Sequence, residues 1–282
     1  MITPTVRGVF RFTNSNLCFL ALALLLTQCR PTDPFIATWK IAEISYQPSP
    51  LATPEAYERG QQIQAMRSGF QNSTFALYEG QRSAFFSTET PYRQGAWSKN
   101  GDRLTLQIGE KAQFAFDIIE LNDTNLVLTL ADVGQTEGEL TLVCQKSKQY
   151  IYGDVDLLAP EQNEWRLKPE RRQTDAEIKQ RAQAHLDYLI SYFECVKENK
   201  QTYFETGLVS SPFAFYAHGL GLSKNSPSAK RWQAYFYDQR DASRAFEQLK
   251  KSIKKIDKYP KANTFTEEYL LAFKKMRIYF DE

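Results

Sequence analysis

Between residues 35 and 146, apolar and polar positions alternate with a period of two, and turn residues interrupt the pattern at short intervals. This spacing predicts β-strands that pair as hairpins with their neighbours in the sequence, and the turn at 99–102, Lys-Asn-Gly-Asp, supplies suitable residues. Eight strands are expected, at residues 35–46, 73–79, 82–88, 92–98, 103–108, 112–120, 125–131 and 138–146.

The later strands of this region have one consistently apolar face. Leu104, Leu106 and Ile108 share a face of one strand, and Phe114 and Phe116 share a face of the next. Eight consecutive strands can bury such a face without exposed edges by closing into an antiparallel up-and-down β-barrel. We therefore expect a closed barrel over residues 35–146, and a sandwich of two sheets is the alternative.

One helical segment interrupts the strands. Thr53-Pro54-Glu55 has a capping residue, a proline at the first helical position and an acid in the first turn, and Ser68-Gly69 supplies a stop. We expect an amphipathic helix between the first and second strands. It either plugs one end of the barrel or acts as a lid over a ligand site.

After residue 172 the apolar period becomes helical. Thr174 is expected to cap a helix that runs to about Lys200, with an inner stripe of large apolar residues. Further helices are expected after Ser211-Pro212, after Ser226-Pro227, before Tyr259-Pro260, and after the capping box Thr264-Phe265-Thr266-Glu267. The sequence thus predicts an α+β protein in which an all-α bundle over 173–282 follows the barrel, with a polar linker over 147–172.

The amino-terminal segment has the features of a targeting signal. Arg7 and Arg11 precede an apolar run, residues 17–26, that is too short to span a bilayer as a helix and has the organisation of a secretory signal. The following Leu26-Thr27-Gln28-Cys29 resembles the lipobox of bacterial lipoproteins, with Gln28 at a position where a small residue is usual. That resemblance implies a signal peptide over 1–28, lipidation of Cys29 and a tether over 29–34.

The proposed lipid would attach the protein to a membrane of the bacterial cell envelope. Arg30, rather than aspartate, follows the cysteine. By resemblance to the bacterial sorting rule this implies the outer membrane, with the periplasmic and surface faces both open. An uncleaved anchor or ordinary secretion is the alternative.

Charge and cysteine content limit the partners and the covalent cross-links that the protein can have. The chain has 35 basic and 33 acidic residues, and removal of Arg7 and Arg11 with the leader would leave the two equal, which argues against a nucleic-acid partner. Only Cys144 and Cys195 remain to form a disulfide. They lie in different predicted domains, and a bridge requires Cα atoms within about 7 Å. We therefore expect two separate buried thiols, and a disulfide between them is the alternative.

Catalytic chemistry is not indicated. The only histidines, His185 and His218, lack the helical ligand spacing of a zinc or di-iron site. We interpret His185 as a partly exposed helix residue and His218 as a structural cap near a helix end, with an active-site base as the alternative for His218. Glu194 and Glu198 share a helix face, where a solvated pair is expected and a shared proton or cation is the alternative. We therefore expect no enzyme, no metal and no cofactor.

A second resemblance concerns the strands. The block Gly95-Ala96-Trp97, Gly101-Asp102-Arg103-Leu104-Thr105-Leu106, Ile118-Ile119-Glu120-Leu121 and Leu126-Val127-Leu128 resembles the repeating part of bacterial lipocalin-like lipoprotein domains. The stretch from Phe35 to Ile41 is similar to their first strand, with Ala37 where glycine is usual. The resemblance covers about residues 34–146 and implies a lipocalin-like barrel more than it implies a function.

Two functional hypotheses follow. The first is a lipid-anchored envelope protein with a non-catalytic binding or scaffolding role, and the alternative is a carrier of a small hydrophobic ligand inside the barrel. The ligand would contact Trp39, Phe75, Leu77, Trp97, Leu106, Phe114, Phe116 and Leu128. A carrier needs a pocket of about 300 Å³ or more, and so many large interior residues favour a barrel filled by its own side chains.

A basic helix face is the candidate surface for an envelope partner. Its lysines lie opposite the apolar stripe of the helix that ends near Tyr259, so they would face solvent, anionic lipid heads or an acidic protein. These residues are Lys250, Lys251, Lys254, Lys255 and Lys258.

Overall fold

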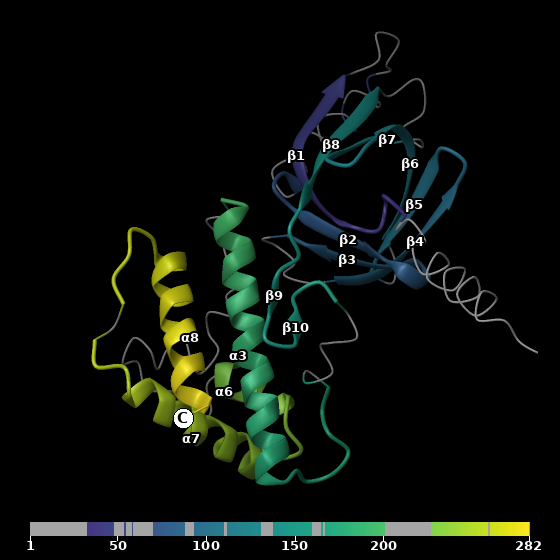
Figure 1. The fold of residues 1–282 in the computed structure, drawn as a ribbon. Coiled ribbons are helices and arrows are strands. Elements are labelled where there is room, and N and C mark those ends of the chain that lie inside the picture. The colour runs from purple at the N-terminus through teal and green to yellow at the C-terminus, as the bar shows by residue number, and fades with distance from the viewer. Residues whose placement is uncertain are drawn as a thin grey trace, which may run out of the picture. The chain divides into compact units, whose positions relative to one another are not determined.

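The computed structural model describes residues 33–47, 54, 58, 70–87, 93–109, 112–130, 138–159, 165, 167–200, 227–258 and 260–281. Within this part of the chain, eight antiparallel strands close into a barrel in sequence order (Figure 1). The strands are β1 Thr38–Gln47, β2 Thr74–Tyr78, β3 Arg82–Phe86, β4 Arg93–Asn100, β5 Arg103–Ile108, β6 Ala112–Leu121, β7 Asn125–Leu130 and β8 Glu139–Ser147. β1 pairs with β8 and closes the barrel. The predicted up-and-down barrel is therefore confirmed, and the sandwich is excluded.

The barrel interior follows the predicted alternation except at two bulges. In β1 the register with β8 shifts between Ile41 and Glu43, so that Ile41 and Ile44 both face the interior. In β6 a shift between Ile118 and Glu120 brings Leu121 against the same core. Each bulge therefore moves the inward face by one position, which a strict period of two does not anticipate.

β2 and β3 are buried on both faces, unlike the other strands. Their inward residues belong to the barrel core, whereas Ala76, Ala84 and Phe86 belong to a second core formed with the helices. The Phe86 ring meets the Tyr192 ring edge to face, with centroids 5.5 Å apart. These two strands therefore read as nearly continuous apolar runs, because neither face meets water.

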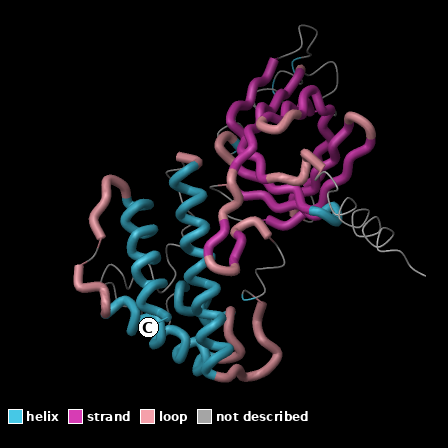
Figure 2. Tube along the Cα trace, viewed as in Figure 1, coloured by secondary structure: helices cyan, strands magenta, loops and turns pink. Residues whose placement is uncertain are grey.

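Four described helices follow the barrel: α3 Asp175–Glu198, α6 Pro227–Ala234, α7 Gln239–Lys254 and α8 Phe265–Asp281 (Figure 2). Thr174 caps α3 as predicted, and its hydroxyl accepts from the Glu177 backbone N–H while the Glu177 carboxylate accepts from Thr174 in return. The expected inner stripe is fully buried, at Leu186, Leu189, Ile190, Phe193 and Val196. The prediction of a helical region after the barrel is confirmed.

The segment 147–172, which we expected to be a polar linker, contains buried structure. β9 Ile151–Tyr152 and β10 Val155–Asp156 form a short hairpin, and Tyr150, Leu157 and Leu158 are buried in the core that includes α3. Because polar residues surround this short apolar run, the sequence pattern did not reveal it. The prediction of a linker is therefore corrected for residues 150–158, which belong to the helical core.

A buried ion pair joins α3 to α8. Arg277 Nε donates to Asp187 Oδ1 at 2.6 Å, and both side chains are largely shielded from water. Burial raises the pKa of Asp187 to about 6, against the opposing effect of Arg277. Gly153, at φ 58°, lies so close that an added Cβ would come within 2.4 Å of Asp187 Oδ2. The turn between β9 and β10 therefore requires glycine at this position.

Several predictions fall outside the described residues. They include the signal peptide, Cys29 and the tether, the helix after Ser211-Pro212, and His218. The helix expected after Thr53 lies almost wholly outside them as well, although Pro54 and Glu58, which are described, are helical.

Candidate functional site

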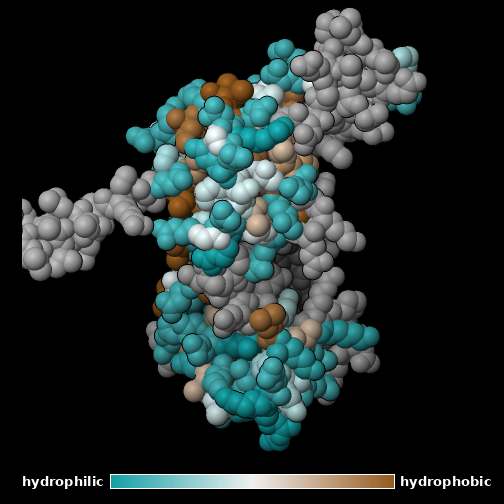
Figure 3. Space-filling view, turned by 90° about the vertical axis from the view of Figure 1, so that its right-hand side faces the viewer, coloured by the Kyte–Doolittle hydropathy of each residue, from teal (hydrophilic) through white to brown (hydrophobic). Residues whose placement is uncertain are grey.

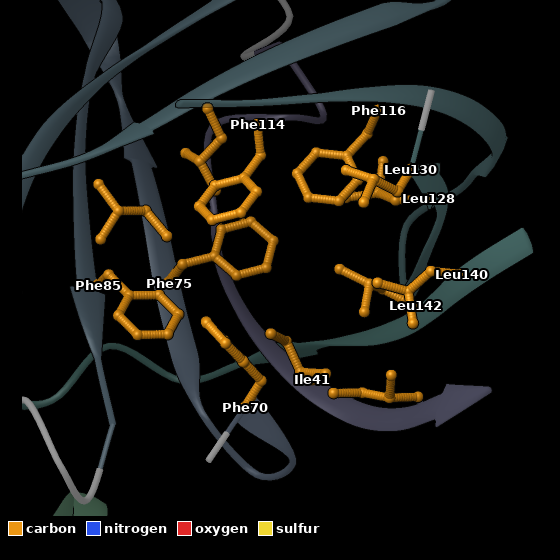
Figure 4. Close-up of a pocket in the computed structure, with 13 residues that line it drawn as sticks. Ile41, Phe70, Phe75, Phe85, Phe114, Phe116, Leu128, Leu130, Leu140 and Leu142 are labelled. Carbon is orange, nitrogen blue, oxygen red and sulfur yellow. The ribbon is translucent and has the colours of Figure 1, made fainter. Parts of the chain in front are cut away.

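A cavity of about 210 Å³ lies inside the barrel (Figure 4). Each of its thirteen described lining residues has an apolar side chain, and together they come from seven strands and the segment before β2. They are Ile41, Ile44, Phe70, Phe75, Phe85, Leu106, Ile108, Phe114, Phe116, Leu128, Leu130, Leu140 and Leu142. No described lining side chain can offer a hydrogen bond or a charge to a molecule in the cavity.

The walls of the cavity differ in chemistry. Phe70, Phe75, Phe85 and Phe114 gather on one side, and the leucines of β7 and β8 lie on the other, with Phe116 beside Leu128 and Leu130 (Figure 4). The Phe114 and Phe116 rings are stacked with centroids 6.2 Å apart, and the Phe70 and Phe85 rings are tilted against each other at 5.8 Å. One wall of the cavity is therefore mainly aromatic and the other mainly aliphatic.

The other half of the barrel interior is filled. Trp39 is fully buried and its indole N–H donates to the Phe35 carbonyl at 3.2 Å. Trp97 donates in the same way to the Tyr78 carbonyl at 2.9 Å, and its ring stacks on Phe35 with centroids 6.3 Å apart. Because both indole donors are satisfied within the protein, these large side chains have defined positions. They plug this end of the barrel.

The two ends also differ in their connections. At the plugged end, neighbouring strands are joined by residues 79–81, 101–102 and 122–124. At the cavity end, the connections are residues 48–73, 87–92, 109–111 and 131–138. The longer connections therefore all leave from the end where the cavity lies, which is the usual place for a ligand site in a barrel.

The structure separates the eight residues that the sequence suggested for ligand contact. Phe75, Leu106, Phe114, Phe116 and Leu128 line the cavity. The remaining three, Trp39, Leu77 and Trp97, belong to the same core but do not line the cavity.

The expectation of a completely filled barrel is corrected, because side chains fill only the end with the two tryptophans. Eight of the thirteen lining residues were not among the contacts that the sequence suggested: Ile41, Ile44, Phe70, Phe85, Ile108, Leu130, Leu140 and Leu142. Phe85 is inward on a strand that is buried on both faces, so alternation could not distinguish it. Phe70 precedes β2 and follows no strand pattern.

Two further pockets, of about 440 and 410 Å³, lie in the described part of the helical region, and charged or polar side chains line both of them beside apolar ones. His185, expected to be partly exposed, is only 2% exposed and its ring packs against Trp165 and Trp232 at centroid distances of 4.6 and 5.2 Å. That expectation is wrong, because aromatic residues far away in the sequence cover this helix position. Among the described residues, no three His, Cys, Asp or Glu side chains gather as metal ligands would.

The remaining candidate residues that the structure describes are two glutamates in ion pairs and two buried cysteines. Glu194 pairs with Lys274 at 2.7 Å and Glu198 pairs with Lys148, so the two carboxylates have separate partners. Cys144 and Cys195 are buried free thiols, as expected.

Of the lysines on the basic face, Lys251, Lys254, Lys255 and Lys258 are exposed, and Lys250 is half-buried. Lys250 pairs with Glu247 at 3.2 Å, and Lys255 Nζ donates to the Tyr279 carbonyl at 3.5 Å. Their role toward a partner stays a prediction.

Figure 3 shows one face of the described part of the molecule. There, hydrophobic residues appear as small groups among hydrophilic ones. In the part of the chain that is described, no helix has the length and apolar character needed to cross a membrane.

Comparison with known proteins agrees with the geometry of the barrel. The family model described as a lipocalin-like domain matches residues 35–128. The match begins at Phe35, which stacks on Trp97, and ends at Leu128, which lines the cavity. A search among curated proteins found none that matches the chain. The closed eight-stranded barrel and this match together identify the barrel region of the chain as a lipocalin-like domain.

Proposed function

We propose that the protein binds a small apolar molecule inside its lipocalin-like barrel. The observation that carries the proposal is the cavity of about 210 Å³ whose described lining side chains are all apolar. It is smaller than the roughly 300 Å³ that we expected of a carrier, but it is larger than an apolar cavity of about 150 Å³ that binds benzene, so it suits a smaller ligand. A water molecule is poorly stabilised in such a space, because a buried water needs two to four polar partners. An apolar ligand loses no hydrogen bonds on leaving water and gains contacts with the walls.

The energetic cost of an empty cavity supports the same function. At roughly 24 cal/mol per Å³ of cavity, a void of this size costs the barrel about 5 kcal/mol of stability. Trp39 and Trp97 show that side chains fill the other half of the same interior. A ligand that occupies the void would recover part of the lost contacts, and would therefore stabilise the folded protein.

Access to the cavity is expected from the end with the longer connections. The opposite end is closed by Phe35, Trp39 and Trp97, whose rings and hydrogen bonds hold one another in place. Release through that end would require both indole N–H groups to leave their carbonyl partners. A binding function therefore uses one mouth, and the plugged end serves stability.

Binding is tested by NMR of the purified full-length protein with ¹³C-labelled leucine methyl groups. The molecules tested range from p-xylene, which is wholly apolar, to palmitate, which has a long apolar chain and a charged head. At least one should shift the methyl resonances of Leu130 and Leu142 in a saturable manner, and should leave those of the exposed Leu167 unchanged. If no member of the panel shifts the cavity methyls at its solubility limit, the binding function is wrong.

We further propose that Cys29 carries a lipid that holds this binding domain at a membrane of the bacterial envelope. The support is the leader itself: two arginines, a short apolar run and the lipobox-like Leu26-Thr27-Gln28-Cys29. A lipid-anchored domain with an apolar cavity would take up or release its ligand close to the membrane. In this role the protein is non-catalytic.

The anchor is tested by mass spectrometry and detergent phase partitioning of the protein made in a bacterial host. The wild type should gain the mass of a diacylglyceryl group and enter the detergent phase, and Cys29→Ser should lose both properties. Cys18→Ser is the matched control, because Cys18 lies within the predicted signal peptide. An unmodified wild type that partitions like Cys29→Ser would contradict the anchor and leave the barrel function untouched.

A further inference from the structure

We propose that the ligand of the barrel is an uncharged aromatic molecule of about eight non-hydrogen atoms, and that long acyl chains are excluded. This inference rests on the proposed binding function and adds the ligand class. It follows from three properties of the same site: the volume of the cavity, the chemistry of its walls and the closed end beneath it.

The volume sets the size of the ligand. An apolar cavity of about 150 Å³ holds benzene, which has six non-hydrogen atoms, or about 25 Å³ for each. The present cavity of about 210 Å³ therefore has room for about eight. On the same scale a sixteen-carbon chain needs about 400 Å³.

The plugged end prevents a longer ligand from reaching deeper. Beneath the cavity, the interior is occupied by Trp39 and Leu126, both fully buried, and by Trp97. The two indole rings are held by hydrogen bonds to the carbonyls of Phe35 and Tyr78. An acyl chain would have to displace these rings and leave two buried donors without partners, which is costly.

The walls select against charge and favour a ring. A carboxylate or ammonium group in the cavity would lose its hydration with no described lining side chain to replace it. The aromatic wall, which includes Phe75, Phe85 and Phe114, can pack edge to face on a flat aromatic ligand, while Leu128 and Leu142 cover its other side (Figure 4). A saturated ring of equal size gains the burial but not the aromatic contact.

The test uses four probes with the methyl-labelled full-length protein. p-Xylene has the predicted size and character, and trans-1,4-dimethylcyclohexane is its saturated counterpart. Benzoate is an aromatic of similar size that carries a charge, and palmitate is a long acyl chain. We expect p-xylene to bind one molecule per chain and at least threefold more tightly than its saturated counterpart. Benzoate and palmitate should leave the Leu130 and Leu142 methyls unchanged.

Substitutions in and outside the cavity wall test whether p-xylene binds inside the cavity. Leu128→Phe adds three carbon atoms to the cavity wall and should weaken p-xylene binding at least tenfold, because the remaining space is too small. Ile119→Phe is the matched control on the same barrel, since Ile119 is 64% exposed and points away from the interior. Leu142→Phe is a second cavity variant, should Leu128→Phe fail to fold.

The outcomes separate this inference from the function on which it rests. Binding of palmitate with no binding of p-xylene would overturn the inference and leave the binding function standing. Equal binding of p-xylene and benzoate, or of p-xylene and the saturated ring, would also overturn it. If none of the four probes shifts the cavity methyls, the inference and the binding function both fail.

Discussion

Replacing Leu128 by phenylalanine is expected to stabilise the barrel, whereas the same replacement at Leu126 is expected to destabilise it. The two leucines are two residues apart on β7, both point into the barrel and both are fully buried. Only Leu128 lines the cavity. The pair therefore differs in one property, the presence of empty space beside the side chain.

The size of the difference follows from the added atoms. Each substitution adds three carbon atoms, and burial of a carbon stabilises by roughly 0.8 kcal/mol, so the available gain is about 2 kcal/mol. At Leu128 the void accepts the larger ring, and we expect a net gain of about 1 kcal/mol after the side chains adjust. At Leu126 there is no such space, and overpacking costs about 1–3 kcal/mol.

The assay is urea unfolding of the two variants and the wild type, followed by tryptophan fluorescence. Trp39 and Trp97 lie in the barrel core and Trp165 and Trp232 in the helical core, so the fluorescence reports the unfolding of both cores. The free energies should differ between the variants by about 2–4 kcal/mol, with Leu128→Phe the more stable. Equal destabilisation by both substitutions would refute the reasoning, because it would show that Leu128 has no more space around it than Leu126.

Three further outcomes follow from local contacts. Gly95→Ala should destabilise the barrel by more than 2 kcal/mol in urea unfolding, because an added Cβ would lie 1.8 Å from the Gln107 carbonyl oxygen; a smaller loss would contradict the close strand packing. Thr174→Ala should cost about 1 kcal/mol in thermal unfolding, because it removes the cap of α3. Bonds from Arg171 and Thr174 lower the pKa of Glu177 to about 2. Its contribution to stability should therefore be complete above pH 4.5 and disappear toward pH 2, which the pH profile of Glu177→Gln against wild type checks.

The sequence predicted the barrel well because alternation is a property of each strand alone. Leu104 and Leu106, like Phe114 and Phe116, face the core as their period of two requires. The same period fails at the bulges, where Ile44 and Leu121 turn inward because one extra residue has been accommodated. A bulge depends on the pairing of two strands, so one strand pattern does not reveal it.

The candidate site was only partly predictable for a different reason. Alternation tells which residues point inward, and thus found Phe75 and Leu128, but it does not tell at which depth each side chain lies. Trp39 and Leu77 are equally inward and belong to the filled end. Trp39 pairs with Phe75 in register, yet only Phe75 lines the cavity. Depth depends on the tilt of the strands in the closed barrel as well as on their register, and a single sequence contains neither.

The helical region shows the same limit. The inner stripe of α3 could be read from its spacing, and the capping residue Thr174 from its local pattern. His185 could not, because the rings that bury it belong to Trp165 and Trp232, which lie elsewhere in the sequence. Burial by distant residues leaves no local signal.

The most direct test of the account is a crystal structure of the protein soaked with p-xylene. The account predicts one ring inside the barrel, between the aromatic wall at Phe75 and Phe114 and the aliphatic wall at Leu142, with Trp39 and Trp97 in place beneath it. A barrel interior closed by its own side chains, or ordered water at that position in place of the ring, would contradict it.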